Sequence, residues 1–238
     1  MDELDLLLED TRHLEIVAVS ADDSSLRTQF LRRLSKHVSR RLDRQIHLLD
    51  FDLQFSSYMS NLVAIEGIGE DMDNRHLAIL QPNESGIEET VIELASSSDL
   101  RPGGIMIIDS VNTLQAMIRN PESDPDSVLA NHKAAILITV LQQTARYYSK
   151  SLWITNITRA RPRVLHSGEV SWEREPIGGR MMLFKSDVLL FLHPMTHNDS
   201  RQEDSIDLQL QANLEKVSGN PSTTKNLKES YAIDLSLL

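Results

Sequence analysis

The chain has 238 residues, of which 40% are hydrophobic, and its formal net charge is −11 at pH 7. This length suits one domain with a sizeable core, while the acidic balance excludes a generally basic nucleic-acid coat and leaves only local basic patches. Because cysteine is absent, disulfides, zinc–thiolate sites, iron–sulfur clusters and thiol nucleophiles are excluded.

Apolar runs of strand length alternate with helical patterns along the chain. Most of the early runs are continuous, as in parallel strands that are buried on both faces. The last two runs follow each other across turn residues, which predicts an antiparallel hairpin at the sheet edge. In chain order we predict strand 14–20, helix 26–43, strands 46–51 and 76–80, helix 86–97, strand 104–109, helix 130–149, and strands 151–155, 187–192, 207–214 and 231–237.

This series predicts one α/β, doubly wound domain over residues 1–238. Before it lies an acidic and apolar segment, 1–13, in which Leu4, Leu7 and Leu8 form a helical stripe. The stripe either packs on the chain's own sheet as a first helix or docks on a partner protein. We expect no secretory or transit signal in this acidic segment, and no apolar stretch of the sequence suggests a membrane span.

The remaining stretches lack periodicity and are predicted to be loops. They are 119–127, 159–176 and 197–205, the last of which is expected to be flexible.

Several short motifs occur in an order that resembles the RecA/RadA recombinase family. The run GGIMIIDS ends an apolar strand in Asp109 followed by Ser110, LWITN ends a later strand at 156, and PIGG follows at 176–179. In phosphate-loop ATPases such an aspartate holds magnesium, although many buried strands end in aspartate. In the family, TN and PxGG bracket the second DNA-binding loop.

The resemblance extends over nearly the whole chain. ELDLLL at 3–8 is similar to the opening of the recombinase core, LLDFDLQF at 48–55 to the end of its second strand, and LEKVSGNPS at 214–222 to its late strand. Each motif is short, so their order is the specific signal. The resemblance implies a RecA-like core with a mostly parallel twisted sheet, flanking helices and an antiparallel C-terminal hairpin. It is closest to the diverged recombinase paralogs.

The phosphate loop of that family is degenerate in this chain. The family pattern is G-x-x-x-x-G-K-[ST] after the first strand, and placing Thr28 on its last position puts Arg27 on the lysine. Ala21 and Leu26 then replace the two glycines, whose backbone freedom lets successive N–H groups wrap a phosphate. The acids at 22–23 would also repel an anion.

Two further positions agree with a decayed nucleotide site. Asp52 matches the family's catalytic glutamate but is one methylene shorter, and Ile157 matches its γ-phosphate sensor but has no polar group. The resemblance implies a nucleotide-binding remnant made of Arg27, Thr28, Asp109, Ser110 and Lys216, with Lys216 offered to a neighbouring subunit. We therefore expect no useful ATP hydrolysis and no cofactor, while weak binding of ATP with magnesium stays open. The histidines show no paired metal-ligand spacing, so no metal site is expected from them.

Two basic segments are candidates for contact with DNA. The resemblance places the family's DNA-binding loop at 159–175, with Arg180 shortly after it. Arginine on phosphates and an indole on a base would be the means, and the loop offers Arg159, Arg161, Arg163 and Trp172. The alternative is a mobile polar loop in which glutamates at 169, 173 and 175 offset the arginines.

The second candidate is the helix 26–43 with its flanking residue 44. Its cationic residues would form a patch for phosphates or for an acidic partner, or else a solvated face. They are Arg27, Arg32, Arg33, Lys36, Arg40, Arg41 and Arg44.

The resemblance implies a non-catalytic accessory subunit of homologous recombination and DNA repair. It would join other recombinase paralogs or the recombinase itself in a heteromeric complex and stabilise the filament on single-stranded DNA. Its location would be nuclear in a eukaryote, and cytoplasmic or nucleoid-associated in an archaeon. Two alternatives are a regulatory RecA-type ATPase with an unorthodox phosphate loop and a scaffold protein without DNA binding.

Overall fold

The computed structural model describes residues 2–41, 44–57, 77–82, 86–97, 100–119, 128–164, 169–176, 185–195, 209–217 and 227–235. The elements are, in chain order, α1 (Glu3–Thr11), β1 (Ile16–Ala21), α2 (Ser24–Arg41), β2 (Ile46–Asp50), β3 (Leu77–Leu80), α4 (Ile87–Ser96), β4 (Ile105–Asp109), α5 (Val111–Ile118), α6 (Val128–Tyr147), β5 (Ser151–Val164), β6 (Val170–Pro176), β7 (Val188–Pro194), β8 (Gln209–Val217) and β9 (Ser230–Asp234).

These strands form one mixed sheet in the order β3-β2-β4-β5-β1-β7-β8-β9, and β6 pairs with the outer part of β5. The first six strands of that order run parallel to one another, whereas β7, β8 and β9 are joined by antiparallel pairing. The predicted α/β class, the mostly parallel sheet and the antiparallel C-terminal strands are therefore confirmed. Every predicted strand is present, each within a few residues of its expected bounds, except that the fifth is longer.

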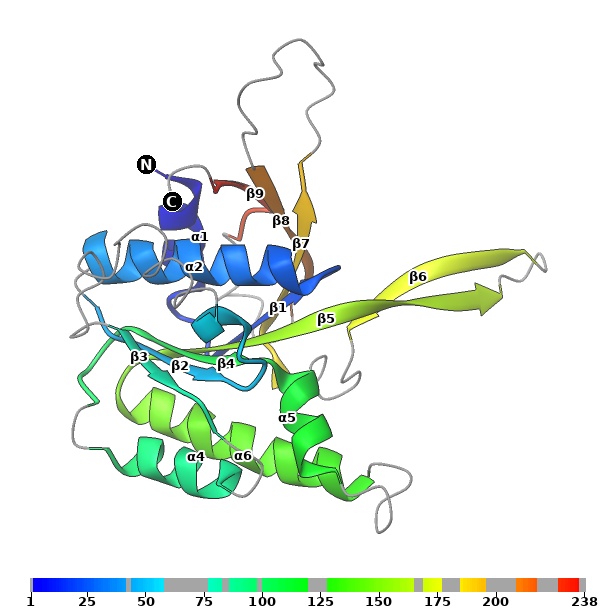
Figure 1. Ribbon diagram of the computed structural model, residues 1–238. Helices are drawn as coiled ribbons and strands as arrows, with labels where there is room; N and C mark the ends of the chain where they lie inside the picture. The colour runs from blue at the N-terminus through cyan, green and yellow to red at the C-terminus, as the bar shows by residue number, and fades with distance from the viewer. Residues whose placement is uncertain are drawn as a thin grey trace.

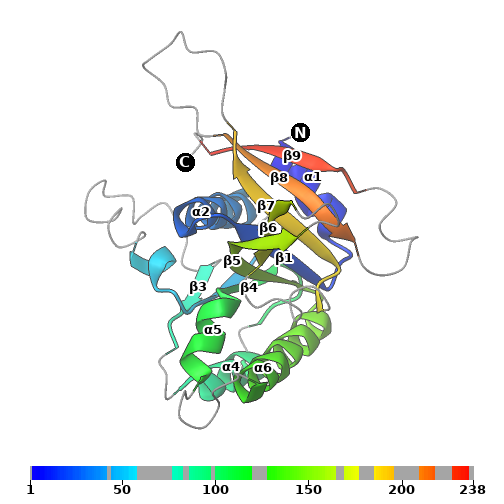
Figure 2. The ribbon, with the colours of Figure 1, turned by 90° about the vertical axis from the view of Figure 1, so that its right-hand side faces the viewer.

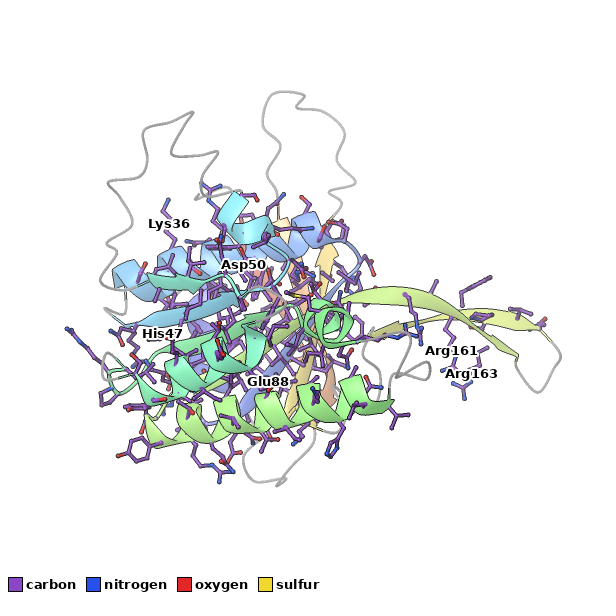
Figure 3. All side chains as sticks on the ribbon, turned by 60° about the horizontal axis from the view of Figure 1, so that its bottom comes forward. Lys36, His47, Asp50, Glu88, Arg161 and Arg163 are labelled. Carbon is purple, nitrogen blue, oxygen red and sulfur yellow. The ribbon has the colours of Figure 1, made fainter. Side chains whose placement is uncertain are left out.

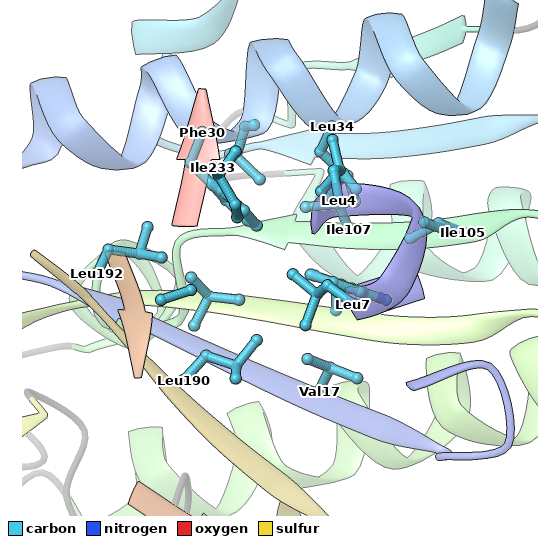
Figure 4. Close-up of a cluster of buried hydrophobic side chains, with 14 of the residues drawn as sticks. Leu4, Leu7, Val17, Phe30, Leu34, Ile105, Ile107, Leu190, Leu192 and Ile233 are labelled. Atoms are coloured by element: carbon cyan, nitrogen blue, oxygen red, sulfur yellow. The ribbon is translucent and has the colours of Figure 1, made fainter. Parts of the chain in front are cut away.

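Helices cover both faces of this sheet, as Figures 1 and 2 show: α1 and α2 lie on one face, and α4, α5 and α6 lie on the other. Because both faces are covered, all residues of β1 and β4 are buried, which explains their continuous apolar runs. On the first face, Phe30 of α2 stacks on Trp153 of β5 with ring centroids 6.2 Å apart. Figure 4 shows the surrounding cluster of aliphatic side chains.

Helix α1 belongs to this core, which supports the expectation that it packs on its own chain. Leu4 and Leu7 are fully buried, and Figure 4 shows both among the core side chains from α2 and the sheet. Asp2 caps the helix, because its carboxylate accepts the Leu4 N–H at 3.2 Å and its own N–H donates to Asp5 at 3.0 Å.

The predicted loop 159–176 is wrong for most of its length. Strand β5 continues to Val164 and pairs antiparallel with β6, from Thr158 opposite Pro176 to Val164 opposite Val170. In Figure 1 this hairpin projects from the body of the protein. In its first strand, arginines alternate with smaller residues. A strand is usually recognised by alternating apolar residues, and here the alternating residues are charged, so the pattern resembled a polar loop. Helix α5 was also not predicted, while segment 197–205 lies outside the described residues.

Candidate functional site

The carboxyl ends of the parallel strands gather polar side chains at one edge of the sheet. Asp50 ends β2 and lies opposite Asp109, which ends β4, and Thr155 lies near the same level on neighbouring β5. Helix α2 begins at this edge, directly after β1. In open α/β sheets this edge is the usual place for ligands, so we treat it as the candidate site.

Arg27 lies at the centre of the site with its side chain turned inward. The side chain is 0% exposed, and the Nε atom lies 2.8 Å from Oδ1 of Asp109. The guanidinium also forms an ion pair with Asp52, whose side chain is 9% exposed. A buried guanidinium thus bridges the two carboxylates that the family resemblance assigns to magnesium and to catalysis.

Hydroxyl groups also donate hydrogen bonds to both carboxylates. Ser110 Oγ donates to Asp52 Oδ1 at 2.9 Å and to Oδ2 at 3.1 Å, and Thr155 Oγ1 donates to Asp109. The main chain joins the same group, because the Phe51 N–H donates to the Asp109 carbonyl at 2.7 Å. The peptide bond between Asp109 and Ser110 is cis. This network joins β2, β4, β5 and α2 through short polar contacts.

Burial sets the acid–base behaviour of Asp109. It raises the pKa of this carboxyl from 3.8 to about 6, although the Arg27 charge and the Thr155 hydrogen bond act in the opposite direction and lower it. The neighbouring carboxylates of Asp52 and Asp50 raise it further. Asp50 is itself fully buried and accepts from the N–H of Ser56 at 2.8 Å.

The amino terminus of α2, where a phosphate would bind, is occupied by the chain's own groups. Only Asp22 and Asp23 separate β1 from α2, and Asp23 Oδ1 accepts the Leu26 N–H at 2.8 Å as an N-cap. The hydroxyl of Thr28, which the resemblance places in the nucleotide-binding remnant, donates to the Ser24 carbonyl at 2.8 Å. The carboxylate of Asp23 thus takes the place that an anion would need.

The structure brings together Arg27, Asp52, Asp109 and Ser110 of the predicted site residues. Ile157 lies further along β5, opposite Ala21 of β1. Lys216 lies in β8 opposite Leu189, near the amino-terminal end of β7 and away from this site. Sequence reasoning missed Thr155, although its position one residue before the end of the motif LWITN is a signal that could have found it.

The hairpin presents its arginines and its tryptophan on opposite faces. Arg159, Arg161 and Arg163 are exposed and follow one another at every second position of β5, and Figure 3 shows Arg161 and Arg163 on the hairpin, well away from Asp50 in the body. Trp172 is 68% exposed and lies opposite Pro162. Because directly opposite residues share a face and neighbours along a strand alternate, one flat contact cannot use both groups. Arg180 lies outside the described residues.

The prediction of a basic patch along α2 is wrong for two of its members. Arg27 is buried as described above, and Arg33 is 6% exposed and points toward α1. The guanidinium of Arg33 pairs with Asp2 at 2.6 Å and its Nε donates to the carbonyl of Asp234 at 3.1 Å. These arginines hold the fold together because each neutralises buried or partly buried acids, so they are not available to a ligand.

In the part of the chain that the structure describes, no group of three or more histidine, aspartate or glutamate side chains is arranged to hold a metal ion. Within those same residues, no helix combines the length and the apolar character needed to cross a membrane.

The pKa of Asp109 predicts a specific pH dependence of stability. A carboxyl whose pKa is raised in the folded state stabilises the fold below its unfolded pKa and loses that contribution as the pH rises through its folded pKa. Relative to an Asp109→Asn variant, the wild type is expected to lose about 3 kcal/mol of unfolding free energy between about pH 4 and pH 6. Urea unfolding of both proteins across this range measures the difference, and a difference that stays constant would contradict the assignment.

No protein-family model matches the chain, and no curated protein matches it at a significant level.

Proposed function

We propose that this chain is a non-catalytic accessory subunit of homologous recombination that resembles the diverged recombinase paralogs. It would join a recombinase or another paralog in a heteromeric complex and help stabilise the filament on single-stranded DNA. The order of the short motifs across the chain and the mixed, mostly parallel sheet support this proposal. In a eukaryote the complex would act in the nucleus, and in an archaeon in the cytoplasm or nucleoid.

The proposal that the subunit is non-catalytic is supported above all by the position of Arg27. A lysine at the corresponding place in the resembling family faces the phosphates, whereas Arg27 is buried and ion-paired with Asp52 and Asp109. For magnesium to reach these carboxylates, the guanidinium of Arg27 would have to leave them. The guanidinium would then be a buried charge without a partner, which costs free energy. Arg27 therefore supplies the positive charge that a magnesium ion would otherwise bring to these carboxylates.

A subunit without its own nucleotide can still act in a chain of subunits. RecA-type cores meet head to tail with the nucleotide between neighbours, so an inert site on one face leaves the other face free to complete a partner's site. The candidate residue for that contact remains Lys216, at the end of the sheet opposite Arg27. This arrangement would let the protein cap a filament end or join two active subunits.

Thermal unfolding with and without ATP and magnesium tests the nucleotide part. A ligand at about one hundred times its Kd adds about 2.7 kcal/mol of stability, so a binding protein would melt at a clearly higher temperature. We expect no shift and no phosphate release, with an active RecA-type recombinase as the positive control. A shift that disappears in Asp109→Asn would instead support a regulatory ATPase.

A separate binding experiment tests the proposed partners and uses the recombinase from the same cell. The chain, immobilised through a tag, is expected to retain the recombinase or a second paralog, and to slow the loss of recombinase from single-stranded DNA in a nuclease-protection assay. A chain that retains neither protein and leaves protection unchanged would contradict the proposal and favour a scaffold outside recombination.

A further inference from the structure

The amino-terminal edge of the parallel strands, opposite the candidate site, collects cationic side chains from separate segments. Each segment immediately precedes a strand of the central sheet: β1, β2, β4 or β5. We call this set the basic edge, and it consists of Arg12, Arg44, Arg101, Arg146 and Lys150. The chain as a whole has a net charge of −11, so this group of cations differs in sign from the protein's overall charge.

Much of this charge has no carboxylate partner within the described ranges. The guanidinium groups of Arg44 and Arg101 contact no acid there, and both side chains are exposed. Arg12 pairs with Glu9 at 2.6 Å and Arg146 with Glu15, which are exposed pairs of little strength. Among the described residues, the five cations of the basic edge thus outnumber the two carboxylates, Glu9 and Glu15, with which they form ion pairs.

Lys150 is the most deeply buried cation of the basic edge. It is 5% exposed, and the only contact of its ammonium group within the described part of the chain is the carbonyl of Gly103. Burial lowers the pKa of Lys150 from 10.5 to about 8, so at neutral pH the group is still charged. An anion bound in a cleft beside Lys150 would offset the cost of burying this charge.

Two adjoining clefts are open along the basic edge. One of about 60 Å³ is lined by residues that include Arg12, Arg44 and Ser149, and one of about 200 Å³ is lined by residues that include Arg12, Arg146, Ser149 and Lys150. Arg12 and Ser149 border both clefts. The strands behind them follow the order β2-β4-β5-β1, so the cations span about 14 Å across the edge at the usual strand spacing. A row of this kind suits a chain of phosphates better than a single small anion.

An exposed aromatic side chain lies at the same end of the sheet, where α6 leads into β5. Tyr147, which follows Arg146 at the end of α6, is 82% exposed and contacts Tyr148 edge to face with ring centroids 5.0 Å apart. Base stacking on an aromatic ring next to a basic groove is the usual means of binding single strands without sequence preference. The ring distinguishes a nucleic acid from inorganic phosphate as the ligand.

We infer that the basic edge binds the phosphate backbone of single-stranded nucleic acid, with Tyr147 stacking on a base. The inference places nucleic-acid contact at the end of the sheet opposite Arg27 and away from the hairpin. It does not depend on the proposed function, because it uses neither the nucleotide site nor the family resemblance.

The test is fluorescence anisotropy of a labelled oligothymidylate, titrated at several salt concentrations. The variant Arg44→Gln/Arg101→Gln removes two exposed cations, so we expect the affinity near 0.15 M salt to fall roughly tenfold and the salt slope to fall by about 1.4. Lys133→Gln/Lys228→Gln is the matched control, because it changes the net charge equally at two cations elsewhere on the surface. It is expected to bind nearly as the wild type does.

Two further variants test whether the oligonucleotide binds at the basic edge or at the hairpin, and whether a base stacks on Tyr147. Tyr147→Ser is expected to weaken oligonucleotide binding without changing the salt slope, while Arg161→Gln/Arg163→Gln on the hairpin is expected to leave binding nearly unchanged. Thermal melting of every variant confirms that it is folded. Wild-type affinity of the Arg44/Arg101 variant, loss of binding only in the hairpin variant, or a response to pyrophosphate without any response to the oligonucleotide would each overturn the inference.

Discussion

Replacing Arg27 with methionine is expected to lower the free energy of unfolding by about 3–5 kcal/mol. Methionine fills much of the same volume, but it leaves the buried carboxylates of Asp52 and Asp109 without the guanidinium that pairs with both. Asp50, which is also buried nearby, adds to the repulsion. Urea unfolding monitored by far-ultraviolet circular dichroism gives the change in unfolding free energy.

Two variants show whether the loss comes from the carboxylates. Arg32→Met, on the same helix but with a half-buried side chain, is the matched control and is expected to change stability much less. Asp109→Asn in the Arg27→Met background is expected to recover part of the loss, because it removes one of the two uncompensated charges. An Arg27→Met protein as stable as Arg32→Met would show that the guanidinium does not hold the site together.

Shortening both Leu4 and Leu7 to alanine is expected to have the second large effect. Each leucine is fully buried, and a leucine-to-alanine change in a core costs about 2–5 kcal/mol. A helix of nine residues is too short to persist in water by itself, so α1 depends on these contacts and on the ion pair between Asp2 and Arg33 of α2. Thermal and urea unfolding of the double variant measure the loss.

Leu8→Ala is the matched control, because Leu8 is only half-buried on the same helix and should cost much less. If the double variant unfolds like the wild type but no longer retains a partner protein, the leucines serve docking and the packing of α1 on its own chain is not what stabilises it. Polar contacts support the packing as well, since a ring nitrogen of His37 lies 2.6 Å from Asp5 and Tyr231 donates to Asp10 at 2.7 Å.

The sequence by itself determined where the strands lie along the chain and where one critical strand ends. Continuous apolar runs predicted β1, β2 and β4 within a few residues, because strands buried on both faces must be apolar throughout. The placement of Asp109 directly after such a run put it at the carboxyl edge, where parallel strands end together. The two turn-linked C-terminal runs likewise predicted the antiparallel pair β8 and β9.

Only the tertiary structure decided which way the charged side chains point. Helical periodicity places Arg27 and Arg33 on α2, but their burial follows from acids on β4, on α1 and after β2, which are distant in the sequence. A long flexible side chain can reach either solvent or a distant carboxylate, and the local pattern is the same in both cases.

The basic edge is also a product of the fold, because strand order brings together cations that lie far apart in the chain. The hairpin of β5 and β6 was not predicted because its many charged residues are typical of a loop.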